Sequence, residues 1–268
     1  MQFKTLSFEE TLPQIGLITL NRPDRLNAIN MDMLEELQVL FGRLQAMESI
    51  LVVILTGAGR AFCSGADLKD AKLRGDVVEQ SKDSGRHLFQ IQKKYAGSIM
   101  GMRGLPQPII AAINGVAAGG GMCLSLASDI TIASRKASFI PSFINIGLSG
   151  GELGSSYFLP RAVGSIRAAE ILMTGRSVEA EEAEKIGLVN AVVDHDALLE
   201  AAVDKAKCLV TKGGPALRLT KESLNVNINA ASLMAAIEFE NRTQSICCTT
   251  SEHAAALTKF NKKSNDRV

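Results

Sequence analysis

Short apolar runs and longer helical patterns alternate along the chain. Five apolar runs are short enough to be strands: residues 15–20, 50–55, 109–113, 130–133 and 187–193. The second of these is rich in β-branched residues and has no polar alternation, which is typical of a strand buried on both faces. Between the first two runs, Asn30 precedes a segment with apolar residues every three or four positions, which predicts a capped amphipathic helix. A strand, a helix and a strand in this order predict a parallel crossover, and hence an α/β fold.

Helical patterns dominate the last quarter of the chain. Helices are predicted over residues 198–209, 215–224, 230–247 and 252–260, and a shorter one is expected to begin at Ser177. We therefore divide the chain into a β/α core, residues 1–195, and an all-helical C-terminal extension, residues 196–268.

The central stretch, residues 105–130, predicts a strand, a turn at Asn114-Gly115, a glycine triplet and a helix. Glycines lack a Cβ, so the N–H groups of residues 119–121 can approach a ligand closely, and the following helix directs its positive dipole end at the same place. A negatively charged oxygen would be stabilised there. The alternative is that the triplet only lets a helix pack tightly on a strand.

A second loop of small residues follows the strand at 50–55. Residues 61–69 read AFCSGADLK, and Gly65-Ala66 exposes the backbone at the carboxyl end of a strand, which is where open α/β sheets bind ligands. The preceding GAGRAF is not a dinucleotide-binding fingerprint, because Phe62 stands where the third glycine belongs.

Composition excludes several classes of function. The formal net charge is +1, so no overall basic field favours nucleic acid or an anionic membrane as a partner. The five cysteines are scattered without a CxxC pair and the three histidines are isolated, which indicates reduced thiols and no metal site. No signal core or membrane-spanning run occurs. We therefore expect a protein of the cytoplasm or, if a transit peptide has been removed, of the mitochondrial matrix.

Several motifs in order resemble the crotonase (enoyl-CoA hydratase/isomerase) superfamily. They are LITLNRPDRLNAIN, VVILTGAGRAFCSGADLK, PIIAAINGVAAGGGMCLSLASDITIAS, FINIGLSGGELGSSYFLPRAVG and AEKIGLVNAVV. The resemblance implies a superhelix of stacked β-β-α turns with a helical C-terminal region used in trimer contacts, and so a homotrimer or homohexamer. It also implies an acyl-CoA thioester substrate, with coenzyme A entering as part of the substrate and no separate cofactor.

The resemblance also assigns roles to single residues. The two backbone N–H groups of the family's oxyanion hole match Ala66 and Gly120, in the two loops already singled out. Arg25, Ser64 and Ala66 match positions that contact coenzyme A, although Arg25, like Arg22, could equally be a solvated turn residue. The remaining positions expected to bind substrate are Asp67, Leu68, Gly119, Cys123 and Phe143.

The chain departs from the hydratase pattern at both catalytic glutamates, which are replaced by Cys123 and Phe143. A thiol is mostly neutral at pH 7 and phenylalanine has no ionisable proton, so neither replaces a carboxylate. The nearby carboxylate is Glu152, in a place that resembles the isomerase branches with one residue of extra spacing. We expect it to be the single acid/base, with double-bond isomerisation somewhat favoured over hydration. Glu152 could instead only stabilise a helix dipole.

Two other functions compete with this interpretation. Residues 147–151, GLSGG, fit the G-x-S-x-G elbow of a serine esterase around Ser149, with Asp194 or Asp196 and His253 downstream. Pro160 argues against that reading, because it should cut short the helix that the elbow needs. The second alternative is a non-catalytic acyl-CoA-binding homologue that kept the oxyanion pocket. The acyl chain itself would be read by residues 68–102, which the motifs do not specify.

Overall fold

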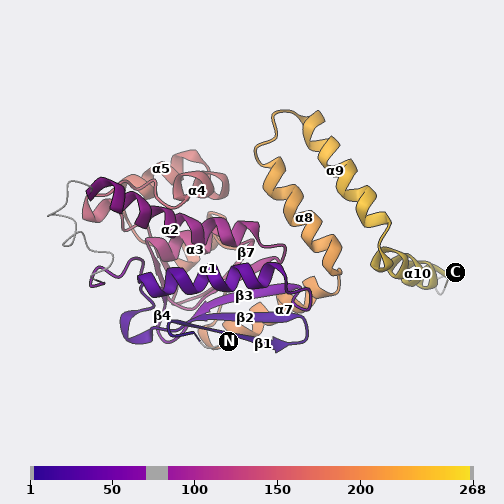
Figure 1. Cartoon of the computed structure of the whole chain (residues 1–268), viewed down its shortest axis with the longest axis horizontal. Helices are drawn as coiled ribbons and strands as arrows, with labels where there is room; N and C mark the ends of the chain where they lie inside the picture. The colour runs from indigo at the N-terminus through magenta and orange to yellow at the C-terminus, as the bar shows by residue number, and fades with distance from the viewer. Residues whose placement is uncertain (1–2, 71–83, 266–268) are drawn as a thin grey trace.

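Two parallel-type sheets form the body of the molecule in the computed structural model, which describes residues 3–70 and 84–265 (Figure 1). The six-stranded sheet has the order β1-β2-β3-β5-β7-β10, and the four-stranded sheet has the order β4-β6-β8-β9. The strands are β1 Leu6–Leu12, β2 Ile15–Leu20, β3 Val52–Gly57, β4 Ala61–Cys63, β5 Ile109–Ile113, β6 Val116–Ala118, β7 Ile130–Ser134, β8 Ser138–Ile140, β9 Val178–Glu179 and β10 Ala191–Val193. The helices are α1 Met31–Gln45, α2 Ser84–Gly104, α3 Gly120–Ala127, α4 Ser155–Val163, α5 Ser165–Thr174, α6 Ala180–Lys185, α7 Leu198–Val210, α8 Gly214–Asn227, α9 Leu233–Cys248 and α10 Ser251–Asn265, with short 3-10 turns at Pro23–Arg25, Ile144–Ile146 and His195–Ala197.

Successive β-β units stack on one another in both sheets. The first strands of the units, β3, β5 and β7, pair in parallel in the large sheet, and the second strands, β4, β6 and β8, pair in parallel in the small sheet. Each unit therefore repeats the path of the one before it, displaced by one strand. This arrangement confirms the predicted stacked β-β-α architecture.

The large sheet is buried on both faces, as the apolar run at 50–55 predicts. Along β3, Val53 and Leu55 belong to the larger core under α1, α2 and α3, whereas Val52 and Ile54 belong to a smaller core. Helix α7 closes this smaller core with residues such as Ala202, so the first helix after residue 196 packs directly on the sheet. With α7 packed on one face and the larger core on the other, residues 52–55 of β3 are buried on both faces, and only Thr56 near the end of the strand is half-exposed.

Helices α8, α9 and α10 extend away from this body as an arm, with the C-terminus at its far end (Figure 1). A buried ion pair anchors the base of the arm: Lys221 Nζ lies 2.8 Å from Asp129 Oδ2 and donates to the Gln107 carbonyl oxygen at 2.9 Å. Arg103 binds the other carboxylate oxygen of Asp129 at 3.1 Å. Burial lowers the pKa of Lys221, and the negative charge of Asp129 opposes this shift.

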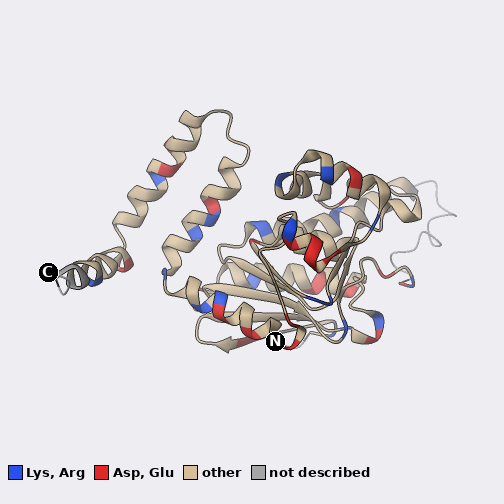
Figure 2. Ribbon diagram, turned by 180° about the vertical axis from the view of Figure 1, so that it is seen from behind, with Lys and Arg blue, Asp and Glu red and all other residues tan. Residues whose placement is uncertain are grey.

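Charged side chains of both signs are interspersed over the body, as the near-zero net charge suggests (Figure 2). None of the helices in the described ranges combines the length and apolar character needed to cross a bilayer.

Three local expectations are wrong. The strand predicted over residues 187–193 is limited to β10, because residues 187–190 form a turn and a bend. Residues 178–179 do not begin a helix; they form β9, which pairs with β8 through Val178 and Phe139, and α6 begins only at Ala180. Pro160 lies inside α4 and does not end it. The helix continues because Leu159 and Val163 are buried in the core, and their burial offsets the hydrogen bond that proline cannot donate.

We predict that Gly121→Ala strongly destabilises the fold. A Cβ at Gly121 would lie 2.8 Å from the carbonyl carbon of Cys63, and closer still to its oxygen, so α3 would have to move away from β4. Urea unfolding should show a loss of at least about 3 kcal/mol. Gly42→Ala is the matched control, because a Cβ there meets nothing within 4 Å inside α1; it should stabilise by roughly 0.5–1 kcal/mol. Equal stabilities for the two variants would contradict the close packing.

Candidate active site

The first loop of the site follows β4. One backbone N–H group in this loop takes no part in the hydrogen bonds that hold the loop in place. Gly65, with φ +90°, accepts from Ile29 N–H at 2.7 Å, and Asp67 N–H donates back to Ile29 O at 2.9 Å. Between these two bonds lies Ala66, whose N–H has no acceptor among the described residues and whose surface is exposed. The local strand-like pairing with Ile29 therefore fixes the direction of a free donor.

Asp67 fastens this loop to the turn before α1. Its carboxylate accepts from Arg22 at 2.8 Å, and both side chains are largely buried. Burial would raise the pKa of Asp67, but the bonds from Arg22 and from the Lys69 N–H outweigh it and hold the pKa below its usual range. Asp67, expected to bind substrate, is thus engaged in an ion pair that shapes the loop.

The three glycines of the second loop have separate tasks. Gly119, with φ +50°, takes a conformation that side chains disfavour, and its N–H donates to Ile140 O at 2.8 Å. Gly121 gives α3 its close approach to β4. Gly120 opens α3, and a Cβ placed there would lie 3.9 Å from Gly65 Cα, so the two loops are in contact. Gly120 is buried, and its N–H, at the N-terminus of α3, has no acceptor among the described residues, so tight packing and an unused donor occur together in one triplet.

Glu152 lies on the loop that precedes α4, in an unusually constrained backbone. Leu153 and Gly154 both have positive φ, +49° and +83°. Ser155 closes this turn: its Oγ accepts from Glu152 N–H at 2.9 Å and donates to Gly150 O at 2.8 Å, while its own N–H donates to Glu152 O at 2.8 Å. The Leu153 side chain then connects the two parts of the site, because its Cδ1 would lie 3.7 Å from a Cβ at Gly120.

The ionisable groups at this point differ in what they can do. Partial burial raises the pKa of Glu152 above the usual glutamate range, and a hydrogen bond from the Leu153 N–H partly opposes the shift. Burial also raises the pKa of the Cys123 thiol, so this side chain stays neutral. Its Sγ lies 3.4 Å from Glu152 O and can donate to it. Cys123 therefore supports the loop of Glu152 and cannot serve as a base.

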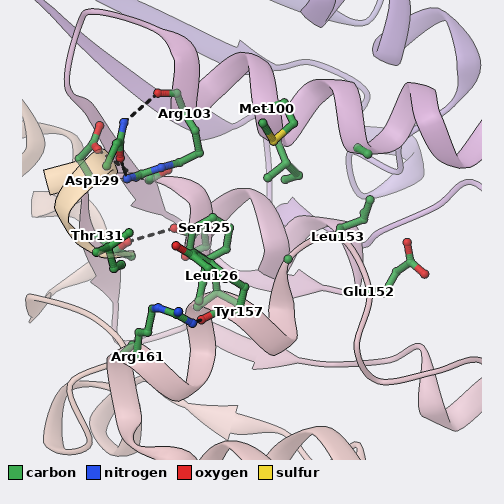
Figure 3. A pocket seen from close by; sticks show the side chains of 18 of the residues that line it. Met100, Arg103, Ser125, Leu126, Asp129, Thr131, Glu152, Leu153, Tyr157 and Arg161 are labelled. Atoms are coloured by element: carbon green, nitrogen blue, oxygen red, sulfur yellow. Dashed lines mark hydrogen bonds and ion pairs between the residues drawn. The ribbon is translucent and has the colours of Figure 1, made fainter. Parts of the chain in front are cut away.

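Glu152 and Leu153 line a pocket with a volume of about 1160 Å³ (Figure 3). The walls come from α2, α3, α4 and the end of α8, and most of the lining is apolar. Asp129 and Arg103 lie on the opposite side of the view from Glu152 and are paired with each other. Glu152, in contrast, has no cationic partner in the part of the chain that the structure describes.

The remaining expected residues lie around this centre at different distances. The Phe143 ring would be 3.5 Å from a Cβ at Gly119, so it flanks the second loop. Ser64 Oγ lies 3.5 Å from Arg25 O, and Arg25 itself is exposed beside the first loop. Leu68 is also exposed. Much of the segment expected to read the acyl chain, residues 71–83, lies outside the described residues.

Sequence reasoning missed two residues that shape the site. Ser155, only 1 % exposed, fixes the turn of Glu152, and nothing but its place three residues after the glutamate could have indicated this. Asn27 is fully buried with φ +54° and donates to the Ala58 and Ala61 carbonyls, which holds the turn of Arg22 against the first loop. An asparagine in a left-handed turn was the available signal.

The esterase alternative does not fit this geometry. Ser149 follows a 3-10 turn, not a strand, and α4 begins only at Ser155, so the serine lacks the strand–turn–helix support of a nucleophile elbow. His253 belongs to α10, at the end of the arm (Figure 1). Within residues 3–70 and 84–265, no group of three His, Cys, Asp or Glu side chains could hold a metal ion.

Comparison with known proteins gives a consistent result. The sequence model of the enoyl-CoA hydratase/isomerase family matches residues 10–267. A Mycobacterium leprae protein named probable enoyl-CoA hydratase is 45 % identical over 87 % of this chain and 78 % of its own length. The 1,2-epoxyphenylacetyl-CoA isomerase of Escherichia coli is 33 % identical over 91 % of this chain and 90 % of its own. The crystal structure of enoyl-CoA hydratase from Bacillus anthracis superposes with a TM-score of 0.88 at 34 % identity, covering 97 % of both chains.

A family match over nearly the whole length, with the stacked β-β-α fold and the paired small-residue loops, establishes the identity of the chain: it belongs to the enoyl-CoA hydratase/isomerase, or crotonase, family of enzymes.

Proposed function

We propose that the protein moves a double bond in an enoyl-CoA thioester by way of an enolate, with Glu152 as the single acid/base. The thioester oxygen accepts hydrogen bonds from Ala66 N–H and Gly120 N–H, and coenzyme A enters only as part of the substrate. The observation that carries the proposal is the position of Glu152, the one pocket carboxylate in the described chain that is not already paired with a cation.

Two fixed N–H donors supply the first requirement of this chemistry. Removal of a proton from the carbon next to a thioester leaves negative charge on the carbonyl oxygen. Donors already aimed at that oxygen stabilise the charge without reorganising, and each contributes roughly 3–4 kcal/mol in comparable sites. The contact between the Gly65 and Gly120 loops supports placing both donors at one oxygen.

A single carboxylate favours isomerisation over hydration. Moving a double bond needs one base that takes a proton from one carbon and returns it to another, whereas hydration must also activate water. Neither the neutral Cys123 thiol nor Phe143 can help with that second task. The relatives carry both hydratase and isomerase names, so the choice rests on these side chains.

The raised pKa of Glu152 suits this shuttle. A base that accepts and returns a proton is most efficient when its pKa lies near the working pH, and burial moves Glu152 in that direction. The same shift means that the folded protein holds this proton at a higher pH than the unfolded chain does, so it costs folding free energy at neutral pH.

We also propose that the arm assembles the protein into a homotrimer or homohexamer. Large apolar side chains on its helices face solvent in the single chain, more than a peripheral element needs. The most exposed are Leu224, Leu233, Met234 and Phe260.

Glu152→Gln tests the assigned base. It keeps the side-chain volume and removes the proton acceptor, so kcat should fall roughly 10²–10⁴-fold while acyl-CoA affinity stays nearly constant. In the wild type, the acidic limb of the kcat profile should lie above the usual glutamate range. Products are read by mass spectrometry: isomerisation leaves the mass unchanged, and hydration adds one water. A fully active variant would exclude Glu152, and acyl-CoA binding without turnover of any enoyl-CoA by the wild type would favour the non-catalytic homologue.

Gly120→Pro tests the oxyanion donor. Gly120 is the first residue of α3, a position that proline occupies readily in helices, so the substitution removes the N–H and adds a ring whose Cβ would lie 3.0 Å from Ile29 Cδ1. We expect kcat to fall about 10²–10³-fold. Gly120→Ala is the control, because it adds a Cβ near Ile29 Cδ1 and keeps the N–H. If both variants lose activity equally although their melting curves match the wild type, the effect is steric and the donor is misplaced.

Sedimentation equilibrium tests the assembly. We expect a mass of three or six 28.6 kDa chains at micromolar concentration. Replacing Leu233 and Met234 on the arm by serine should shift the mass toward one chain. A wild-type mass equal to a single chain would contradict the proposal.

A further inference from the structure

We infer that the acyl group of the substrate is long or bulky and apolar, on the order of ten carbons or more. This inference rests on the proposed function for the position of the thioester. It adds a class of substrate to that function, and the evidence for it comes from the part of the pocket beyond Glu152.

The size of the pocket is the first reason. Sites that take drug-sized ligands span roughly 300–1,000 Å³. The pocket here reaches about 1160 Å³, so a four-carbon acyl group would leave most of it to water. A site built for a short chain has no need of that space.

The chemistry of its walls is the second reason. Large apolar side chains line the space from three helices, and the two on α2 are exposed: Phe89 is 58 % exposed and Met100 69 %. Leu126 of α3 and Phe158 of α4 complete this surface, and Met100 and Leu126 both lie in the wall that Figure 3 shows. Exposed apolar surface gathered in one hollow indicates an apolar ligand.

Leu153 joins the pocket to the proposed reacting centre, because Ala66 and Gly120 themselves are not among the residues that line the pocket. Leu153 lines it and lies beside Gly120, and Glu152 lines it on the same side. A thioester held by the two loops would therefore direct its acyl chain past Glu152, along Met100 and Leu126, toward the pair of Arg103 and Asp129.

The far wall is rigid and does not select a charged chain. Asp129 is held by both Arg103 and Lys221, and Arg103 O accepts from Asn225 Nδ2 at 3.1 Å. The positive charge of Arg161 is stacked on the Tyr157 ring at 3.8 Å. Because Asp129 is paired with two cations and Arg161 is exposed to solvent, an uncharged hydrocarbon can end there without leaving either charge buried and unpaired.

The first experiment measures binding without chemistry. Saturated acyl-CoA thioesters of four to twelve carbons are titrated into the full-length protein by calorimetry, below their critical micelle concentrations. Each methylene that enters the pocket should raise the affinity about two- to fourfold. The enoyl-CoA series should show the same trend in kcat/KM.

A substitution that fills the pocket tests whether the acyl chain binds there. Met100→Trp should lower the ratio of twelve-carbon to four-carbon kcat/KM at least tenfold, and lower the twelve-carbon affinity in parallel. Met173→Trp is the matched control, because Met173 is 76 % exposed on α5 and does not line the pocket; its ratio should equal that of the wild type.

The outcomes separate the two proposals. Affinity that rises with chain length in a protein that turns over no enoyl-CoA would support the acyl assignment and reject the proposed reaction. Turnover with no dependence on chain length would support the reaction and overturn the acyl assignment. A wild-type ratio in Met100→Trp would overturn the placement of the chain in this pocket.

Discussion

The site depends on one close contact, between the backbone of α3 at its start and the backbone of β4. At Gly121 there is no room for a Cβ above the Cys63 carbonyl, and this close approach brings the N-terminus of α3 to the loop that leaves the same strand. Because β4 and β6 are neighbours in the small sheet, the stacking of one β-β unit on the next sets the spacing of the two loops. The spacing of the two loops is thus a consequence of the fold's repeat, and the packing of the backbone fixes it.

Glu152, the proposed acid/base, is held in a different way. Ala66 and Gly120 offer main-chain donors fixed by sheet and helix, whereas Glu152 lies on a loop held by Ser155, by Cys123 and by two residues with positive φ. A base on such a loop can be replaced or relocated without disturbing the donors. This explains how the chain can carry Cys123 and Phe143 at the two positions where hydratases of the family have glutamates. The neutral thiol that fills one of those positions now supports the loop of the carboxylate elsewhere.

The parts of this molecule that could be predicted from its sequence are those fixed by local or periodic patterns. Residues 15–20 and 109–113 are strands with the predicted bounds, and Asn30 caps α1 by accepting from Met33 N–H. Strands β4, β6, β8 and β9 are not predicted, because each has at most three residues and depends on pairing with strands distant in sequence. Pro160 was misjudged for the same reason, since the burial that keeps α4 intact is tertiary. The glycine and small-residue patterns identify the two loops, but the support that Ser155 gives to Glu152 is visible only in the folded chain.

Main-chain donors also limit how much any sequence can reveal about the reaction. A backbone N–H has no side-chain signature beyond smallness, so the proposed donors at Ala66 and Gly120 would stabilise an oxygen without specifying which reaction follows. In the proposed reaction, that choice depends on which carboxylate of the pocket is unpaired. Asp129 is held by Arg103 and Lys221 at the far wall, while Glu152 has no cation among the described residues and is raised in pKa by burial. Within this one pocket, the paired carboxylate of Asp129 has a structural task, whereas the unpaired carboxylate of Glu152 is available for chemistry. The residues that create this difference come from four separate elements, and only the folded chain brings them together.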